Sequence, residues 1–316
     1  MHKRRLGNSE LETLPLIFGG NVFGWTIDEQ LSFKLLDAFT GAGFNMIDTA
    51  NSYSRWVPGN KGGESETIIG NWIKQRNNRD KIIVATKVGS DMGDEKKGLS
   101  KTYIFSAVED SLARLRTDYI DLYQSHFDDL ATPVEDTMDA YSELIKQGKV
   151  RVIGVSNLSP ERLKQSVDYG NTKNLSRYET LQPQYNLYDR EDFEKNYQSY
   201  CIANKISVLP YSSLASGFLT GKYRSENDLF KSARGEGITK YLNDRGNLIL
   251  RALDKIAARN NTRPASVALA WLMTRPTVAA PIASATTIEQ LHDLINGANL
   301  QLDKEDLELL DRMSEY

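Results

Sequence analysis

The sequence predicts an α/β fold, a (β/α)8 barrel of the TIM type that begins with a short N-terminal β-hairpin. Apolar runs of strand length alternate with segments of helical periodicity along the chain. Several runs, such as residues 82–85, lack the alternation of apolar and polar residues that marks a strand with one exposed face, which is typical of a parallel sheet buried on both sides. The length of 316 residues suits one barrel, so we expect a single domain over residues 1–316.

Each strand is predicted from a local pattern. Residues 4–6 and 13–16 are predicted to be short strands on either side of Asn8 and Ser9, which favour a turn, and together they give the opening hairpin. Eight apolar runs then predict the barrel strands, at residues 16–19, 44–47, 82–86, 119–123, 150–155, 180–182, 206–209 and 278–282. A doubly wound open sheet is the alternative, but no strand precedes the Gly-x-Gly-x-x-Gly pattern of a Rossmann phosphate loop.

Start and stop signals predict the helices between these strands. Thr132 and Glu135 form a capping-box pattern at the start of one helix. Ser159 is predicted to cap the next helix and Gly170 to end it. Residues 303–316 predict an acidic amphipathic helix that packs on the outside of the barrel.

Composition and charge disfavour several classes of function. The net charge of −3 has no strong block of one sign, which argues against binding to nucleic acid or to an anionic membrane, because both need a basic surface. No apolar run approaches the roughly 20 residues that a membrane helix needs. The single cysteine, Cys201, and the absence of a secretory pattern predict a cytoplasmic protein. No metal site is expected, because the three histidines form no metal-binding motif.

Ionisable side chains stand at the ends of three consecutive predicted strands. Asp48 ends the second strand and Tyr53 follows it, Lys87 ends the third strand, and His126 ends the fourth. Taken singly, each has a structural explanation, as a turn cap, a surface lysine, a hydrogen-bonded histidine or packing at the rim. Chemistry in such a barrel takes place at the carboxyl ends of the strands. Four ionisable groups at one rim therefore predict an active site.

These residue types suit proton transfer to a carbonyl oxygen. A free phenol has a pKa of about 10, and a nearby ammonium group stabilises the phenolate and lowers that pKa. Lys87 is expected to do this for Tyr53, while Asp48 holds Lys87 and a neutral His126 orients the carbonyl. Neither an activated nucleophile nor a metal motif supports hydrolysis. Because no side chain donates hydride, a reduction needs a cofactor.

A series of short motifs is distributed over nearly the whole chain. They occupy residues 18–24, 45–53, 63–66, 85–89, 111–115, 119–126, 153–157, 182–186, 210–217, 219–223 and 281–284. In this order they resemble the motifs of the aldo-keto reductase superfamily. The resemblance implies a (β/α)8 barrel that binds a nicotinamide dinucleotide in an extended form and reduces a small aldehyde, ketone or sugar-like carbonyl.

The resemblance also implies roles for individual residues. Tyr53 would be the general acid, Lys87 its partner, Asp48 the carboxylate paired with Lys87, and His126 the residue that orients the carbonyl. Tyr211 would stack on the nicotinamide ring. The other positions implied for the cofactor are Asn21, Asp48, Ser156, Asn157, Gln182, Ser212, Leu214, Ser216, Gly217, Lys222, Ser284, Thr286 and Gln290.

Three aromatic residues are candidates for the substrate pocket. Phe23, Trp25 and Trp56 follow the first two predicted strands and are expected to line an apolar entrance. Packing within the loops is an equally good explanation of the two tryptophans. We expect a monomer or a small homo-oligomer that acts on a small carbonyl substrate and binds neither nucleic acid nor a membrane.

The choice of cofactor depends on charge after the last strand. Relatives that prefer NADPH often carry basic residues there, whereas this chain has Thr286 and Gln290. Without a fixed cation, discrimination for the 2′-phosphate weakens, because charge-assisted contacts are the strong ones. NADP(H) is somewhat favoured by the resemblance, and NAD(H) or dual use stays open, as does a cation from elsewhere, such as Arg234. The connection 216–244 is typical of a lid or a binding loop.

Two other functions stay open on the sequence. One is a non-enzymatic regulatory subunit that senses the cofactor and keeps the dinucleotide site. The other is lyase or isomerase chemistry in which Lys87 forms a Schiff base. Turnover of carbonyl compounds and borohydride trapping, respectively, distinguish them from a reductase.

Overall fold

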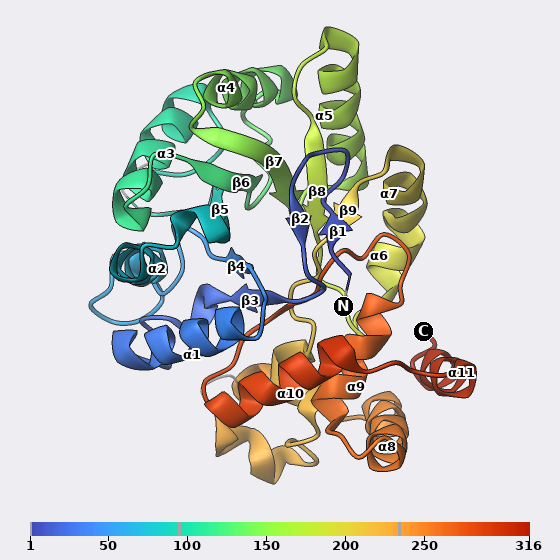
Figure 1. The fold of residues 1–316 in the computed structure, drawn as a ribbon. Helices are drawn as coiled ribbons and strands as arrows, with labels where there is room; N and C mark the ends of the chain where they lie inside the picture. The colour runs from blue at the N-terminus through green and yellow to red at the C-terminus, as the bar shows by residue number, and fades with distance from the viewer. Residues whose placement is uncertain (1, 94–95, 233–234) are drawn as a thin grey trace.

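Eight parallel strands form a sheet at the centre of the molecule, and helices surround it, so the predicted barrel and its hairpin are confirmed (Figure 1). This computed structural model describes residues 2–93, 96–232 and 235–316. The hairpin pairs β1 (Arg4–Arg5) with β2 (Glu12–Thr13). The barrel strands are β3 (Ile17–Gly19), β4 (Met46–Asp48), β5 (Ile83–Val88), β6 (Ile120–Ser125), β7 (Val150–Ser156), β8 (Tyr178–Gln182), β9 (Ser207–Val208) and β10 (Ile282–Ala283).

Backbone hydrogen bonds close this sheet. The strand order is β10-β3-β4-β5-β6-β7-β8-β9, and each neighbouring pair is parallel. At the remaining junction, the N–H of Val208 donates to the carbonyl of Thr277 at 2.8 Å, and the N–H of Ala279 donates to the carbonyl of Val208 at 2.9 Å. A bridge between Val208 and Val278 therefore joins β9 to the segment that leads into β10.

The interior of the barrel has an apolar layer below a polar one. Leu6 and Leu11, which flank the hairpin turn, share a buried cluster with side chains of the strands, so the hairpin closes the amino-terminal end of the barrel. This cluster contains Leu6, Leu11, Ile17, Met46, Ile83, Ala85, Leu122, Val152, Leu209, Ala279, Ala280 and Ile282. Because side chains alternate between the two faces of a strand, the next inward residues lie two positions further along. In β4, β5 and β6 these are Asp48, Lys87 and Gln124, and all three are buried.

A second, larger apolar core lies between the sheet and the helices. The helices are α1 (Glu29–Gly41), α2 (Glu64–Arg76), α3 (Lys101–Leu115), α4 (Val134–Lys146), α5 (Pro160–Lys173), α6 (Glu191–Asn196), α7 (Gln198–Asn204), α8 (Asp244–Arg259), α9 (Pro264–Met273), α10 (Ile288–Asn299) and α11 (Lys304–Met313). On α3, Ile104, Val108 and Leu112 are buried at helical spacing, as an amphipathic helix requires. Ser159 caps α5 as predicted. In the part of the chain that the structure describes, no helix has the length and apolar character to cross a membrane.

Two predicted helix boundaries are wrong. α4 begins at Val134 without a side-chain cap, because the hydroxyl of Thr132 instead donates to Oδ2 of Asp129 at 2.6 Å. α5 continues beyond Gly170 to Lys173. A Cβ atom at Gly170 would lie 2.9 Å from the carbonyl oxygen of Ser176, so the glycine allows close packing and does not end the helix.

The described residues of the connection 216–244 include three short 3-10 helices, η3 (Ala215–Thr220), η4 (Glu226–Lys231) and η5 (Gly235–Tyr241). Tyr223 and Tyr241 are buried, and the hydroxyl of Tyr241 donates to Oδ2 of Asp189 at 2.7 Å. The described part of this connection therefore packs against the barrel.

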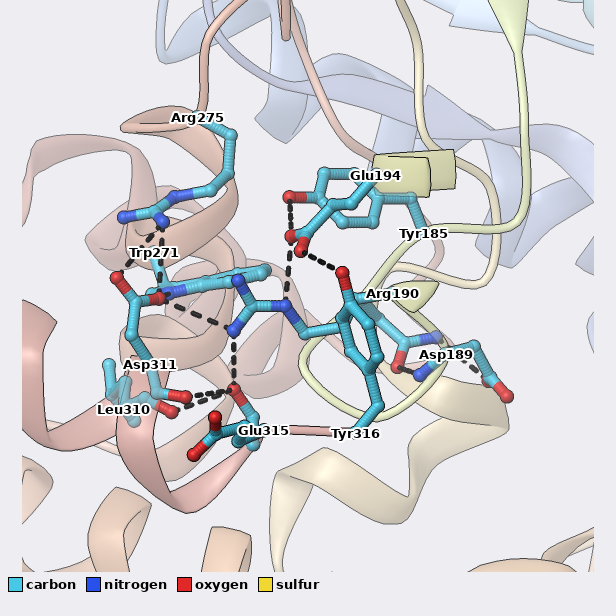
Figure 2. Close-up of polar contacts among 12 residues, drawn as sticks. Tyr185, Asp189, Arg190, Glu194, Trp271, Arg275, Leu310, Asp311, Glu315 and Tyr316 are labelled. Atoms are coloured by element: carbon cyan, nitrogen blue, oxygen red, sulfur yellow. Dashed lines mark hydrogen bonds and ion pairs between the residues drawn. The ribbon is translucent and has the colours of Figure 1, made fainter. Parts of the chain in front are cut away.

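The C-terminal helix packs on the outside of the barrel, as predicted, and a group of polar contacts around Arg190 holds the tail (Figure 2). Arg190 Nη1 donates to Oγ of Ser314 at 2.7 Å. The guanidinium groups of Arg190 and Arg275 lie 4.9 Å and 4.6 Å from the ring centroid of Trp271. Trp271 Nε1 in turn donates to Oδ1 of Asp311 at 2.8 Å. The tail is thus fixed to α6 and α9 by charged groups and one indole ring.

The thiol of Cys201 lies inside the core. It is a buried free cysteine on α7. Burial away from water disfavours the thiolate and raises the pKa of the thiol to about 12. Cys201 is therefore an apolar packing residue at neutral pH.

Candidate active site

A cleft of about 780 Å³ opens at the carboxyl ends of the barrel strands. It reaches from Tyr53 and His126, beyond β4 and β6, to Arg263 and Gln290, at the starts of α9 and α10. This is the end of the barrel opposite the hairpin. The position agrees with the general rule for this architecture, in which the loops after the strands build the site.

The ammonium group of Lys87 does not line this cleft but lies directly behind Asp48 and Tyr53, which do. Its Nζ donates to Oδ2 of Asp48 at 2.7 Å, to the hydroxyl of Tyr53 at 2.9 Å and to the carbonyl of Thr49 at 2.9 Å. The three hydrogens of the ammonium group are therefore all used, and the side chain is fully buried. Burial lowers the pKa of Lys87, and the neighbouring Asp48 carboxylate opposes that shift.

Two buried amides complete the environment of Asp48. Gln182 Nε2 donates to Oδ1 of Asp48 at 2.9 Å, and Gln124 Nε2 lies 3.3 Å from the same oxygen. Oδ2 faces Lys87, so the two carboxylate oxygens have separate partners. Buried charge is tolerated when it is paired and hydrogen-bonded in this way. Gln124 was not predicted, although it lies on the inward face of its strand, two positions after the buried Leu122.

His126 stands beside the phenol of Tyr53, with 6.0 Å between the ring centroids. Its Nδ1 lies 2.8 Å from the hydroxyl oxygen of Ser90. Burial, and then the nearby charge of Lys87, lowers the pKa of His126 well below its ordinary range. A neutral imidazole at pH 7 follows from this shift. Ser90, which follows β5, is a partner that the sequence analysis missed.

The residues predicted around a nicotinamide ring lie together on one side of the cleft. Ser156, Asn157, Gln182 and Tyr211 all line it. The hydroxyl of Ser156 donates to the carbonyl of Gln182 at 2.8 Å, and that of Tyr211 donates to Oδ1 of Asn157 at 3.1 Å. Asn157 Nδ2 also donates to the carbonyl of His126 at 2.9 Å. These contacts tie the four residues to the histidine loop.

The other predicted cofactor positions continue along the cleft. They are Asn21, Ser212, Leu214, Ser216, Gly217, Lys222, Ser284, Thr286 and Gln290, and all of them line it. The backbone curls through Ala215, Ser216 and Gly217, whose φ angles of 47°, 56° and 100° are left-handed. Successive residues in such conformations form concave surfaces that bind anions. Lys222 adds a positive charge beside this turn.

The geometry agrees with the outcome of sequence comparison. A sequence model of the Aldo/keto reductase family matches residues 15–315. The chain belongs to the aldo/keto reductase family. It is 35% identical over 294 residues to the aldo-keto reductase YhdN of Bacillus subtilis (strain 168), which covers 91% of this chain and 84% of that protein. It is 33% identical over 313 residues to the uncharacterized oxidoreductase YrpG of the same strain, covering 96% and 93%, and 32% identical over 335 residues to the protein tas of Escherichia coli (strain K12), covering 96% and 95%.

The substrate side of this aldo/keto reductase differs from the prediction at two residues, Phe23 and Trp25. Phe23 is fully buried and stacks on Phe18, with 5.4 Å between the ring centroids, so it does not line the cleft. Trp56 lines the cleft and is 50% exposed. Trp25 is not a lining residue. Its ring meets the ring of Trp56 edge-on, with 5.4 Å between the ring centroids. Phe127, which was not predicted, lines the cleft and stacks on the ring of His126, with 4.8 Å between the ring centroids.

A charged residue of the cleft was also missed by the sequence analysis. Arg263 lines it from the N-cap position of α9, directly before Pro264. The proline marks the start of a helix, but nothing in the local sequence indicates that this helix begins beside the strand ends. Arg234, named as an alternative source of positive charge, lies outside the described residues.

Proposed function

We propose that this aldo/keto reductase reduces aldehydes or ketones, and reversibly oxidises alcohols, by hydride transfer from NAD(P)H with Tyr53 as the general acid. One observation carries the proposal. Lys87 Nζ lies 2.7 Å from Asp48 Oδ2 and 2.9 Å from the Tyr53 hydroxyl, and both of these residues line the cleft. An acid, a buried ammonium group and its counter-charge are thus in hydrogen-bonding contact before any substrate arrives.

The cleft fits an extended dinucleotide. Its volume of about 780 Å³ falls in the range of roughly 300–1,000 Å³ that small-molecule sites occupy. The nicotinamide end would lie beside Ser156, Asn157 and Tyr211, and the phosphates beside the left-handed turn at Ser216 and the ammonium group of Lys222. When bound there, the reduced nicotinamide supplies the hydride that the carbonyl carbon accepts.

Tyr53 supplies the proton. As the carbonyl oxygen gains negative charge, the phenol gives its proton to that oxygen, and the ammonium group of Lys87 stabilises the phenolate that is left. Asp48 keeps Lys87 in place, and the amides of Gln124 and Gln182 keep Asp48 in place. Because these groups are already oriented, little reorganisation accompanies the proton transfer.

His126 orients the substrate. A neutral imidazole whose Nδ1 accepts a hydrogen bond from Ser90 carries its proton on Nε2, which then donates to the carbonyl oxygen. Trp56 and Phe127, which are 50% and 47% exposed at the cleft, would contact the remainder of the substrate. Their aromatic surfaces favour an apolar group next to the carbonyl.

The burial of Lys87 argues against Schiff-base chemistry. Its amine is fully buried and donates each of its hydrogens to a protein oxygen. A lysine that attacks a carbonyl must be accessible and must lose a proton, whereas the Asp48 carboxylate favours the charged amine. The contacts of Lys87 therefore support a role in activating Tyr53.

We further propose that residues 1–316 act as one domain, in a cytoplasmic monomer or small homo-oligomer. The mixed surface charge, with a net value of −3, and the single cysteine support this proposal.

The test is turnover of Tyr53→Phe on a panel of aromatic and aliphatic aldehydes and ketones, with NADPH and with NADH. We expect kcat to fall by roughly 10²–10⁴-fold, the usual contribution of a general acid, while the Kd of the cofactor stays within a few-fold. Tyr169→Phe is the matched control, because that hydroxyl contacts Asp139 on the outer helices and lies outside the cleft.

Two results would contradict the proposal. If Tyr53→Phe kept its turnover within a few-fold of the parent protein, another group would be the acid. If the parent protein bound the cofactor tightly but reduced no member of the panel, a cofactor-sensing role would be favoured over catalysis.

A further inference from the structure

The positive side chains of the cleft do not come from the segment after β10. After β10, where relatives that prefer NADPH often carry basic residues, Thr286 and Gln290 are hydrogen-bonded to one another. Gln290 Oε1 accepts from the N–H of Thr286 at 2.9 Å and from its hydroxyl at 3.1 Å. This pair is neutral, so it offers no charge to a phosphate. Among the described residues that line the cleft, the side chains charged positively at pH 7 are Lys222 and Arg263.

Lys222 lines the cleft beside Gly217. Its Nζ would lie 3.5 Å from a Cβ atom built on Gly217, so it sits against the left-handed turn that we assign to the phosphates shared by NADH and NADPH. Its ammonium group also lies 5.0 Å from the ring centroid of Tyr223. A cation at this position attracts both cofactors alike and cannot distinguish them.

Arg263 lines the cleft where α9 packs on η3 and α10, whereas Tyr53 lines it beyond β4. Arg263 is the N-cap residue of α9 and has an extended backbone, with φ −105° and ψ 153°. α9 packs on α10, and Arg263 lines the cleft together with Gln290, Asp293 and Leu294 of that helix. The guanidinium group therefore approaches the region after β10 from a different element of the fold.

Among the described residues, no salt bridge neutralises the charge of Arg263. Many arginines of the chain are in ion pairs, for example Arg190 with Glu194 and Arg224 with Asp254. Within the described residues no carboxylate oxygen lies in ion-pair distance of Arg263, although Asp293 is close enough for Arg263 to act against the burial that raises the pKa of its carboxyl group. An arginine beside a ligand cleft with its fork of donors free is suited to a phosphate, which it binds in a bidentate manner.

We propose that Arg263 is the residue that selects NADPH, by binding the 2′-phosphate of the adenosine ribose. The inference rests on the proposed function, because the nicotinamide must lie beside Tyr53 for the adenosine to reach α9. It assigns the discrimination to the residue before α9 and not to the segment after β10. It also resolves the choice of cofactor that Thr286 and Gln290 left open.

Direct binding tests this inference without turnover. Kd values for NADPH, NADH, 2′,5′-ADP and 5′-AMP are measured by calorimetry for the parent protein and for Arg263→Gln. We expect NADPH and 2′,5′-ADP to bind about tenfold more weakly to the variant, equivalent to about 1.4 kcal/mol, with NADH and 5′-AMP unchanged within about twofold. The preference of the parent protein for NADPH should also weaken as salt rises, because charge interactions are screened.

Three variants serve as controls. Arg263→Lys should recover part of the preference, because it restores the charge without the fork. Lys222→Gln should weaken the binding of NADPH and of NADH by similar factors. Arg251→Gln removes an exposed arginine of α8 that does not line the cleft, so it should change neither Kd.

The failures of the two proposals differ. Equal affinity of the parent protein for NADPH and NADH, or an equal loss of both in Arg263→Gln, would overturn the role of Arg263 while leaving the reductase proposal in place. If neither dinucleotide bound the parent protein, the proposed function itself would fail.

Discussion

The hydroxyl oxygen of Ser90 lies 2.8 Å from Nδ1 of His126. Ser90 follows β5 and His126 follows β6, so this contact links two neighbouring loops above the strand that carries Lys87. When the serine donates, the imidazole proton is confined to Nε2 and the ring keeps one orientation. The contact therefore determines whether His126 can donate to a carbonyl oxygen.

Ser90→Ala should lower kcat without changing cofactor binding. A neutral hydrogen bond contributes roughly 0.5–1.5 kcal/mol, so we expect roughly a two- to tenfold loss of kcat. Ser90→Thr keeps the hydroxyl and should recover most of the activity. Steady-state kinetics with one aldehyde and a calorimetric Kd for the cofactor measure both effects. Equal kcat values for Ser90→Ala and the parent protein would show that the histidine is oriented without the serine.

The depressed pKa of His126 predicts how stability depends on pH. The unfolded histidine has a pKa near 6.5, and the folded one lies well below that value, so the unfolded state binds the proton more readily. This contribution to the free energy of unfolding is complete above about pH 6.5 and is lost as the pH falls from there toward the folded pKa. Urea unfolding between about pH 5 and 8 should show this fall, and His126→Asn should reduce it. An identical pH dependence in the variant would contradict the prediction.

Glu66 should matter far more for stability than an exposed glutamate. Its fully buried carboxylate accepts from the hydroxyl of Thr86 at 2.5 Å and from Nε of Arg114 at 2.7 Å. Removal of one partner from a buried ion pair costs about 3–5 kcal/mol, so Glu66→Ala should lower the free energy of unfolding by that amount. In the control, Glu143→Ala, the lost partner is the exposed Lys101, and the cost should stay below about 1 kcal/mol. Similar denaturation midpoints for the two variants would refute this account.

Replacing each of two helical glycines by alanine should change the stability of the protein in opposite directions. A Cβ atom at Gly70 of α2 would lie 2.1 Å from the carbonyl oxygen of Arg114, so Gly70→Ala must push α2 and α3 apart. We expect a destabilisation of about 1–3 kcal/mol. At Gly41 of α1 the same atom would meet nothing within 4 Å, and Gly41→Ala should stabilise by about 0.4–1 kcal/mol. Thermal unfolding of both variants checks the sign, and a gain in stability at Gly70 would be inconsistent with the close approach of the helices.

The parts of the fold that follow from periodicity could be predicted from the sequence. The barrel strands were found because apolar runs alternate with helices, and Asp48, Lys87 and His126 were found because they end such runs. The helix boundaries were predicted less accurately, because they depend on local contacts. The hydroxyl of Thr132 binds Asp129 and does not cap α4, and that choice depends on a loop geometry that the sequence does not reveal.

Residues whose role depends on distant partners could not be predicted. Gln124 is hydrogen-bonded to Asp48 on another strand, and Arg263 lines the cleft because α9 begins beside α10. Phe23 was expected at the entrance, yet it turns inward and stacks on Phe18. In each case the side chain type is visible in the sequence, whereas its direction is set by packing between elements far apart in the chain.

The inert thiol of Cys201 makes the protein convenient for spectroscopy. Since the native chain has one cysteine, and that cysteine is buried with its thiol protonated at neutral pH, maleimide dyes should leave the parent protein unlabelled. A cysteine introduced at Phe230, which is 85% exposed on η4, would then be the sole labelling site. Emission from a dye attached there would report, in real time, whether the connection 216–244, which contributes Lys222 and Ser232 to the cleft lining, moves when a ligand enters.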